Sequence, residues 1–376
     1  MISEKSTSSK KTIVVNATAT VTSGALTILQ QFLESVNEFN LNFIVFCCVK
    51  LEIKAVTNIE FIILNKKNYL ERVFWDYYGF RRSIKKLKIE PFLIMSFQNT
   101  GVVFDKKIPQ LIYYHNIIPL ISRYWNPIKK NERILWFYAK IYPFFVSYLI
   151  MRNTYFIVQA EWIKKKLSKK FDVALKKIFV IPPSVALHIV DDQLVTVSEI
   201  YRLFYPATGF IYKNHNLLFE MLKILKLVNN DLFKRTNLVL TLTEDEIKTL
   251  GLMEDYSCMK NNITLTGNLS KDRIWQEYTQ SKVVLFPSTI ETVGLPLIEA
   301  ASQNKYIFCA KEEYALETLA GYKNVEFIDS YDSQAWADAF NNLIKYEKAI
   351  IPSNIWNKHS ANTWIEVLGT INKITH

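Results

Sequence analysis

The sequence predicts an α/β protein made of two doubly wound, parallel-sheet domains that face a cleft. Its 376 residues exceed what one ordinary hydrophobic core organises, so two domains are expected. Hydrophobic residues make up 49% of the chain, which is enough to fill a core in each domain. Short apolar runs alternate with helix-length segments through both halves, a pattern typical of parallel sheets. Ligands of such sheets bind beyond the carboxyl ends of the strands.

The first domain is predicted over residues 1–190. Its predicted strands are apolar runs that end in turns or at proline: 12–20, 41–49, 59–65, 91–97, 109–116, 154–160 and 177–185. Its predicted helices are 23–34, 71–90 and 161–170. Gly24 stands where the first strand turns into the first helix, a place where backbone can approach a ligand closely. Simple turn chemistry is the alternative for this glycine.

The second domain is predicted over residues 191–350, and residues 184–200, which lack clear periodicity, form the linker. Its predicted strands are 203–210, 238–243, 262–270, 283–286, 305–310 and 325–329. Its predicted helices are 214–228, a segment from 295, a segment around 315–319, and 333–346. Gly267 follows a strand, so a ligand contact and a plain turn are equally good interpretations of it.

The clearest functional signal is the stretch 282–305, in which a buried strand, a loop and a helix follow one another. Pro287 and Ser288 end the strand, and Pro296 occupies the first helical turn. Backbone amides at such a helix start favour a phosphate, and Gly294 lets the backbone approach it. The residues predicted to bind a diphosphate-containing ligand here are Thr292, Val293, Gly294, Leu295 and Glu299.

Two glutamates, Glu291 and Glu299, flank this helix start with seven residues between them. The stretch resembles the carboxylate motif of retaining glycosyltransferases of family four, hexosyltransferases with the GT-B fold of two Rossmann-like domains. Val293 stands where that family usually has phenylalanine. The resemblance implies that Glu299 binds the donor ribose and that Glu291, near the sugar, is catalytic. Alternatively, both carboxylates only cap and solvate the helix start.

Lys213 precedes the helix predicted at 214–228 and could contact the same diphosphate. The segment resembles the basic motif of the family, an arginine and a lysine separated by four residues, with Thr208 in the arginine position. An ordinary surface lysine is the alternative. His115 ends the strand at 109–116, and its surroundings resemble the histidine loop of the first domain of the family. The resemblance makes His115 catalytic, whereas a satisfied loop histidine is the alternative.

Charge is distributed unevenly along the chain. Residues 1–190 hold 28 Lys and Arg against 12 Asp and Glu, a net +16, and the remainder holds 18 against 23, a net −5. An anionic acceptor or an anionic membrane surface is therefore expected to face the first domain. A nucleic-acid partner is not expected, because no recognition motif accompanies the charge.

No metal site and no cofactor are predicted, because neither an Asp-x-Asp motif nor a His/Cys cluster occurs. The four cysteines, Cys47, Cys48, Cys258 and Cys309, lack metal-ligand spacing and are expected to be buried free thiols of a reducing cytoplasm. The N-terminus lacks the apolar core of a signal peptide. The longest apolar run, 142–151, is too short to span a bilayer. We therefore expect a cytoplasmic protein, peripheral at the inner membrane face.

The resemblance implies a metal-independent, retaining transfer from a nucleotide-sugar, either a UDP- or a GDP-sugar, to a glycan or lipid-linked acceptor. Surface polysaccharide or glycan assembly is the usual setting of relatives. The tail at 351–376 is expected to form a helix that crosses back to the first domain, as in GT-B proteins. The alternative is a non-catalytic GT-B protein that serves as a partner or glycan-binding subunit of a transferase complex. Family members often have Gly-Gly where this chain has Ser23-Gly24. The departures at Ser23, Thr208 and Val293 leave that alternative open.

Overall fold

The computed structural model describes residues 11–20, 23–36, 39–51, 53, 57–65, 68–183, 199–346, 351 and 363–375, with the backbone alone at 23, 24 and 27. Most of the predicted linker, 184–198, lies outside this part of the chain. Contacts within the chain divide it into two compact units. Unit 1 comprises Met1–Pro183 and Asn362–His376, and unit 2 comprises Ser184–Ala361.

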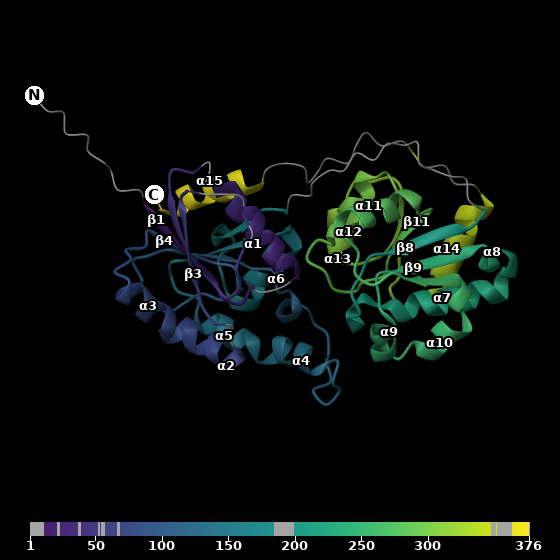
Figure 1. Ribbon diagram of the computed structural model, residues 1–376, viewed down its shortest axis with the longest axis horizontal. Coiled ribbons are helices and arrows are strands. Elements are labelled where there is room, and N and C mark those ends of the chain that lie inside the picture. The colour runs from purple at the N-terminus through teal and green to yellow at the C-terminus, as the bar shows by residue number, and fades with distance from the viewer. Residues whose placement is uncertain are drawn as a thin grey trace, which may run out of the picture. The chain divides into compact units, whose positions relative to one another are not determined.

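Unit 1 is built on a seven-stranded sheet of order β3-β2-β1-β4-β5-β6-β7, in which every strand pairs in parallel (Figure 1). Its strands are β1 (Thr12–Ala17), β2 (Asn42–Cys47), β3 (Ile59–Ile63), β4 (Leu93–Ser96), β5 (Gln110–Tyr113), β6 (Thr154–Val158) and β7 (Ile178–Val180). Successive side chains of a strand point to opposite faces of the sheet. Both faces of this sheet are covered, because each faces a hydrophobic core. Ile13 and Val15 join one core, and Val14 joins the other.

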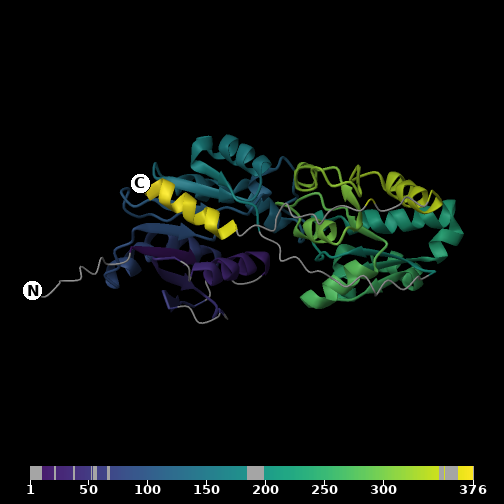
Figure 2. The same ribbon diagram turned by 90° about the horizontal axis from the view of Figure 1, so that it is seen from above.

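Helices α1 (Ser23–Ser35) and α15 (Thr363–Thr375) cover one face of this sheet, and the π-helical turn η2 (Trp75–Gly79) and helix α3 (Phe80–Lys86) cover the other. Phe32 of α1 packs 5.3 Å from Trp364 of α15, ring centre to ring centre, so the last helix of the chain completes the core of unit 1 (Figures 1 and 2). The helices of unit 1 are α1 (Ser23–Ser35), α2 (Tyr69–Phe74), the π-helical turn η2 (Trp75–Gly79), α3 (Phe80–Lys86), η3 (Ile118–Leu120), α4 (Arg133–Lys140), α5 (Tyr142–Tyr148), α6 (Glu161–Phe171), η4 (Leu175–Lys177) and α15 (Thr363–Thr375).

Unit 2 is built on a six-stranded parallel sheet of order β10-β9-β8-β11-β12-β13. Its strands are β8 (Tyr201–Tyr205), β9 (Thr236–Leu240), β10 (Ile263–Leu265), β11 (Val283–Phe286), β12 (Tyr306–Ala310) and β13 (Val325–Ile328). Its helices are η6 (Ile211–Lys213), α7 (His215–Val228), α8 (Asn230–Lys234), α9 (Glu244–Leu250), α10 (Met253–Cys258), η7 (Lys260–Asn262), α11 (Lys271–Gln280), α12 (Leu295–Ser302), α13 (Glu313–Thr318) and α14 (Ser333–Lys345).

Each sheet reverses its strand order beside its first strand, between β1 and β4 in unit 1 and between β8 and β11 in unit 2. At such a switch point the loops that leave the two strands diverge to opposite faces, which leaves backbone amides and side chains free for a ligand. The fold therefore singles out two loop pairs, one beyond β1 and β4 and one beyond β8 and β11.

Several local features differ from the sequence-based prediction. The helix predicted at 71–90 is interrupted by the π-helical turn η2, which inserts one extra residue per turn at Trp75–Gly79. Helices α4, α5 and α8 to α11 were not predicted, although Thr243 and Ser270 cap α9 and α11 and are recognisable signals. No helix in the described part of the chain is both long and apolar enough to cross a membrane.

Two of the cysteines depart from the prediction that all four are buried. Cys258 is exposed in the short helix α10, and Cys48 is half-buried just after β2. Cys47 and Cys309 are buried, and burial raises the pKa of both thiols.

Candidate functional site

The loops that leave β8 and β11 bring a cation and a carboxylate together at the switch point of unit 2. Lys213 ends η6, and Glu291 lies in the loop before α12. Lys213 Nζ forms an ion pair with Glu291 Oε1 although the two residues are 78 positions apart. Each side chain is 16% exposed, so solvent reaches both groups. Both residues were predicted as site residues, and their direct contact was not.

Hydrogen bonds to backbone carbonyls hold these two loops in register. The Tyr212 carbonyl accepts from Thr289 N at 2.9 Å and from Thr289 Oγ1 at 3.1 Å. Tyr205 OH donates to the Lys213 carbonyl at 2.7 Å. The side chain of Asn214, at the start of α7, does not cap that helix; its Nδ2 donates to the Ser330 carbonyl at 2.7 Å. The position of Lys213 is therefore set by the backbone on both sides of it.

Three tyrosines surround the Glu291 carboxylate. Burial, and next the negative charge of Glu291, raise the pKa of Tyr205 and Tyr314 well above the usual value and that of Tyr212 to about 12. These phenols therefore stay neutral around neutral pH. Glu291 is the charged group that a positive centre would meet here, with Lys213 as its present partner.

The start of α12 is shaped for a close approach of an anion. Gly294 precedes the helix with φ at +67°, a conformation that side chains with a Cβ rarely adopt. Val293 is buried, and its carbonyl accepts from Thr318 Oγ1 at 2.7 Å, so valine serves as a packing residue there. Among the residues that the structure describes, no hydrogen bond is recorded from the amides of Val293, Gly294 and Leu295. Thr292 lies in the same loop and is partly exposed.

Glu299 lies in the second turn of α12, and its carboxylate has a partner that the sequence did not suggest. Tyr278 OH, from α11, donates to Glu299 Oε2 at 2.8 Å. Burial raises the pKa of Glu299, while the Tyr278 hydrogen bond and the positive charge of Lys271 oppose the shift.

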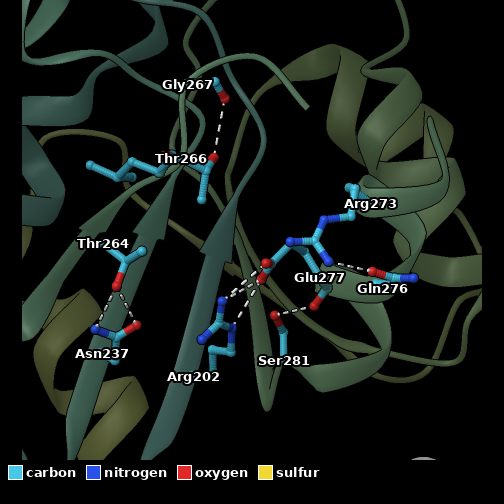
Figure 3. Close-up of polar contacts among 10 residues, drawn as sticks. Arg202, Asn237, Thr264, Thr266, Gly267, Arg273, Gln276, Glu277 and Ser281 are labelled. Carbon is cyan, nitrogen blue, oxygen red and sulfur yellow. Dashed lines mark hydrogen bonds and ion pairs between the residues drawn. The ribbon is translucent and has the colours of Figure 1, made fainter. Parts of the chain in front are cut away.

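Gly267 lies beyond the end of β10, the edge strand two positions from β8 (Figure 3). Its φ of +62° lies in the left-handed region, which favours glycine. Its N–H donates to Leu242 O at 3.1 Å, and its carbonyl accepts from Thr266 Oγ1 at 3.1 Å. The turn by itself therefore accounts for this glycine. The Arg202–Glu277 ion pair in the same view, at 2.8 Å, joins α11 to the amino end of β8, opposite the ligand edge of the sheet.

At the switch point of unit 1, His115 follows β5 and is held by Asn99, which follows β4 with φ at +66°. Asn99 Oδ1 accepts from the backbone N–H of His115 at 2.6 Å, and Asn99 Nδ2 lies 3.3 Å from His115 Nε2. Because the amide nitrogen is a donor, Nε2 is the acceptor and the proton resides on Nδ1. Burial lowers the pKa of His115 to about 4, against a smaller opposite effect of the Tyr113 backbone, so the ring is neutral at physiological pH. Gly24 lies near the start of α1, after the loop that leaves β1.

A buried carboxyl group, that of Asp76, lies next to the loop that follows β4, and the sequence analysis did not predict it. Asp76, in the π-helical turn, accepts from Gln98 Nε2 at 2.5 Å, Asn16 Nδ2 at 3.2 Å and Thr100 Oγ1 at 2.8 Å. Its donors Gln98 and Thr100 flank Asn99, so Asp76 fixes the loop that carries the partner of His115. Burial raises the pKa of Asp76 to about 7, although the three hydrogen bonds and Arg72 oppose the shift.

Groups of three or more His, Cys, Asp or Glu residues that could hold a metal ion are absent from the described residues.

Comparison with known proteins identifies the architecture. A family model described as "Glycosyl transferases group 1" matches residues 192–358, the greater part of unit 2. No curated protein sequence matches. The chain is similar to a glycosyltransferase from Rickettsia africae, with 15% identity, a TM-score of 0.69, and coverage of 97% of this chain and 99% of that one.

It is also similar to HepE of Anabaena in complex with UDP-glucose, with 14% identity, a TM-score of 0.65, and coverage of 96% and 99%. WaaG, a glycosyltransferase involved in lipopolysaccharide biosynthesis, has 11% identity, a TM-score of 0.65, and coverage of 97% and 99%. These likenesses, together with the two parallel sheets, show the GT-B fold and confirm the predicted fold class.

Proposed function

We propose that this chain is a retaining, metal-independent glycosyltransferase of family four that transfers a hexose from a UDP- or GDP-sugar to a glycan or lipid-linked acceptor. The proposal rests above all on the Lys213–Glu291 contact at the switch point of unit 2, beside the start of α12. The match of the family model to residues 192–358 and the likeness to a UDP-glucose complex support it.

In this proposal residues 191–350 bind the donor. The diphosphate accepts hydrogen bonds from the amides at Val293 to Leu295 and from Lys213, which stabilise the charge of the leaving group. Glu299 accepts from the ribose hydroxyls in competition with Tyr278. Thr292 lies in the loop that covers the donor.

Residues 1–190 bind the acceptor, with His115 near the reacting hydroxyl. The bond between the sugar and the diphosphate breaks, the acceptor oxygen attacks the same face of the sugar, and its proton passes to a diphosphate oxygen. A neutral His115 can orient the hydroxyl without becoming a cation. Glu291 stabilises the positive charge that develops on the sugar. The proposed setting is surface polysaccharide or glycan assembly, in the cytoplasm and at the inner membrane face. The likeness to WaaG, a glycosyltransferase involved in lipopolysaccharide biosynthesis, supports an assembly role.

The test is the release of nucleoside diphosphate from a panel of nucleotide-sugars, with and without candidate acceptors. We expect release from one base–sugar combination, stimulated by an acceptor, and a product that keeps the anomeric configuration of the donor. Binding of a nucleotide-sugar without release under any acceptor would instead identify a non-catalytic GT-B protein, and no binding at all would refute the donor site.

The variant Lys213→Ala directly tests whether Lys213 binds the diphosphate. Loss of a charge-assisted phosphate contact should weaken nucleoside diphosphate binding by about 1.5–3 kcal/mol in calorimetric titration. Lys223→Ala is the matched control, because Lys223 also pairs with carboxylates, at 2.9 and 2.8 Å, but on the exposed side of α7. Equal affinity of the two variants would make Lys213 an ordinary surface residue.

A further inference from the structure

Arg72, in helix α2 of unit 1, is a cation that the described residues leave unpaired. Its Nε atom is buried and makes no hydrogen bond. Its guanidinium group forms no ion pair with any carboxylate in the described part of the chain. Buried donors of folded proteins are nearly always hydrogen-bonded, and buried charges are paired. The unpaired guanidinium group therefore indicates a place where an anion binds.

Three tyrosines from three helices lie around Arg72, and we call these four residues the Arg72 cluster. The Arg72 guanidinium carbon lies 5.7 Å from the ring centre of Tyr69 in α2. Tyr138 of α4 and Tyr142 of α5 meet edge to face, with ring centres 5.2 Å apart. Burial raises the pKa of both of these phenols, and the positive charge of Arg72 opposes the shift in each. Arg72 therefore lies within electrostatic reach of both hydroxyls, and Figure 1 shows α2, α4 and α5 on one side of unit 1.

The two acidic residues next to Arg72 in the sequence do not neutralise it. Glu71 is engaged at the start of α2, where its Oε2 accepts from the Asn68 backbone N–H at 2.8 Å. Asp76 accepts three hydrogen bonds from other side chains, and burial raises its pKa to about 7. The charge of Arg72 has the smallest effect on that pKa among the groups that oppose the shift. The positive charge of the Arg72 cluster therefore remains available to a ligand.

The Arg72 cluster is open to solvent and offers several hydrogen-bond donors. Tyr69 is 51% exposed, and Arg72 and Tyr138 are partly exposed. The guanidinium group of an arginine presents its N–H donors as a planar fork that fits the two oxygens of a phosphate or carboxylate. Because the Tyr138 phenol stays protonated at neutral pH, its hydroxyl can donate to the same group. The cluster therefore has the charge and the donors that bind an oxyanion.

Tyr142 connects the Arg72 cluster to the loop that follows β4. Its hydroxyl donates to the Gln98 carbonyl at 3.2 Å. The next residue, Asn99, accepts from the backbone N–H of His115 at 2.6 Å. An oxyanion at Arg72 would therefore bind in unit 1, beside the loop that holds the proposed acceptor-site histidine. A charged group carried by the acceptor, away from its reacting hydroxyl, fits this position.

We propose that the Arg72 cluster binds an oxyanion, either a phosphate or a carboxylate, carried by the acceptor of the transfer reaction. The guanidinium group of Arg72 binds two oxygens of this group, and the hydroxyls of Tyr69 and Tyr138 donate to it. Tyr142 links the bound group to the loop that holds His115. The assignment to the acceptor rests on the proposed function, whereas the binding of an oxyanion rests on the unpaired cation and its donors.

The first experiment is calorimetric titration of the full chain with inorganic phosphate and, separately, with acetate. All proteins carry Lys213→Ala, which removes the phosphate contact of the proposed donor site. Arg72→Gln is the test variant, and Arg81→Gln is the matched control, because Arg81 is an exposed arginine of the following helix, α3. We expect the control to bind at least one of the two anions and Arg72→Gln to bind it at least about tenfold more weakly.

The preferred anion identifies the group as a phosphate or a carboxylate. Equal affinity of Arg72→Gln and Arg81→Gln overturns the proposal, and so does binding of neither anion by the Lys213→Ala protein. In those cases Arg72 would have a structural role, through its contact with the Tyr69 ring.

Two milder substitutions keep the test decisive if Arg72→Gln does not fold. Arg72→Lys keeps the charge and loses the planar fork, and Tyr138→Phe removes one hydroxyl and keeps the ring beside Tyr142. Each should weaken binding of the preferred anion severalfold and leave the thermal unfolding midpoint close to that of Arg81→Gln. Undiminished affinity in both variants would overturn the proposal, because the anion would then contact neither the fork nor the hydroxyl.

Transfer kinetics test the assignment to the acceptor. Pairs of acceptors that differ by one phosphate or carboxylate group are compared in Arg72→Gln and Arg81→Gln, both with Lys213 intact. Arg72→Gln should raise the KM of the acidic acceptor about tenfold and leave the KM of the neutral acceptor and of the donor unchanged. Equal effects on acidic and neutral acceptors overturn the assignment. Absence of nucleoside diphosphate release from the wild-type chain would refute the proposed function instead, and the titrations would still decide whether Arg72 binds an oxyanion.

Discussion

At the scale of single residues, Lys213 and Glu291 form one electrostatic unit. Each is the nearest opposite charge of the other, and both are accessible to a ligand. A diphosphate that binds Lys213 must compete with Glu291, and a positive centre that approaches Glu291 must compete with Lys213. Binding of a nucleotide-sugar between them would satisfy both charges at once.

Substitution of the two glutamates should therefore affect different kinetic constants. Glu291→Gln should lower kcat on the order of a hundredfold, because charge stabilisation that exists only in the transition state is lost. Affinity for nucleoside diphosphate should stay equal or increase, since Lys213 loses its carboxylate partner. Glu299→Gln should chiefly raise the donor KM, by roughly tenfold, because ribose contacts exist in ground and transition states alike.

Steady-state kinetics and calorimetry distinguish these outcomes. Tyr278→Phe is the control for Glu299, because it removes the 2.8 Å hydrogen bond and keeps the carboxyl group. A wild-type kcat in Glu291→Gln would show that the reaction centre lies elsewhere.

Asp76 should make the stability of unit 1 depend on pH. The folded protein keeps a proton on Asp76 up to a pKa of about 7, whereas the unfolded chain releases it near 3.8. Between these values the folded state binds the additional proton, so the free energy of unfolding falls as pH rises and levels off above about 7. The total change is on the order of a few kcal/mol.

Asp76→Asn removes this titration and keeps two hydrogen-bonding atoms. The stability of the variant relative to wild type should rise steadily between pH 4 and pH 7, as measured by urea denaturation across that range. A difference that does not vary with pH would mean that Asp76 has an ordinary pKa in the folded protein.

At the scale of elements, the start of α12 depends on Gly294. A Cβ there would lie 3.2 Å from Leu297 Cδ1 and 3.3 Å from both Phe286 and Tyr314, and φ is +67°. Gly294→Ala should destabilise the protein by about 1–3 kcal/mol and weaken nucleotide binding, because the helix start that carries the amides must shift.

Gly369→Ala is the matched control, because Gly369 lies within α15 with nothing within 4 Å of an added Cβ. Alanine should be neutral there or stabilise by up to about 1 kcal/mol. Denaturant titrations of both variants make the comparison, and similar stabilities would show that the φ of Gly294 carries no strain for alanine.

At the scale of the whole molecule, the last helix of the chain belongs to the core of the first unit. Trp364 contacts Phe32 and Tyr113 at ring distances of 5.3 and 6.2 Å, and Val367 and Ile371 follow on the same side of α15. Trp364→Ala should destabilise unit 1 by about 3–5 kcal/mol because a large cavity is left.

Hydrogen exchange read by mass spectrometry should show this loss in peptides from β1 and β4 and not in those from β8 and β11. Trp336→Ala, which removes a fully buried tryptophan of α14, should give the opposite pattern. Equal effects of either variant on both units would contradict a division of the chain into two separate cores.

The sequence by itself determined the alternation of strands and helices, and therefore two parallel sheets with their ligand edges. It also determined the strand–loop–helix segment that carries Glu291, Gly294 and Glu299. These features depend on periodicity and on proline and glycine, which act over a few neighbouring residues.

Only the tertiary structure decided which side chains meet. The pairing of Lys213 with Glu291, the hydrogen bond of Tyr278 to Glu299 and the polar cluster at Asp76 join segments from different strands and helices. The same holds for the two basic helices, α3 and α6, which look alike as sequence. Packing buries the apolar residues of α6 and leaves those next to α3 exposed. Which apolar face is covered depends on the helices packed against it, and this information is spread over the whole chain.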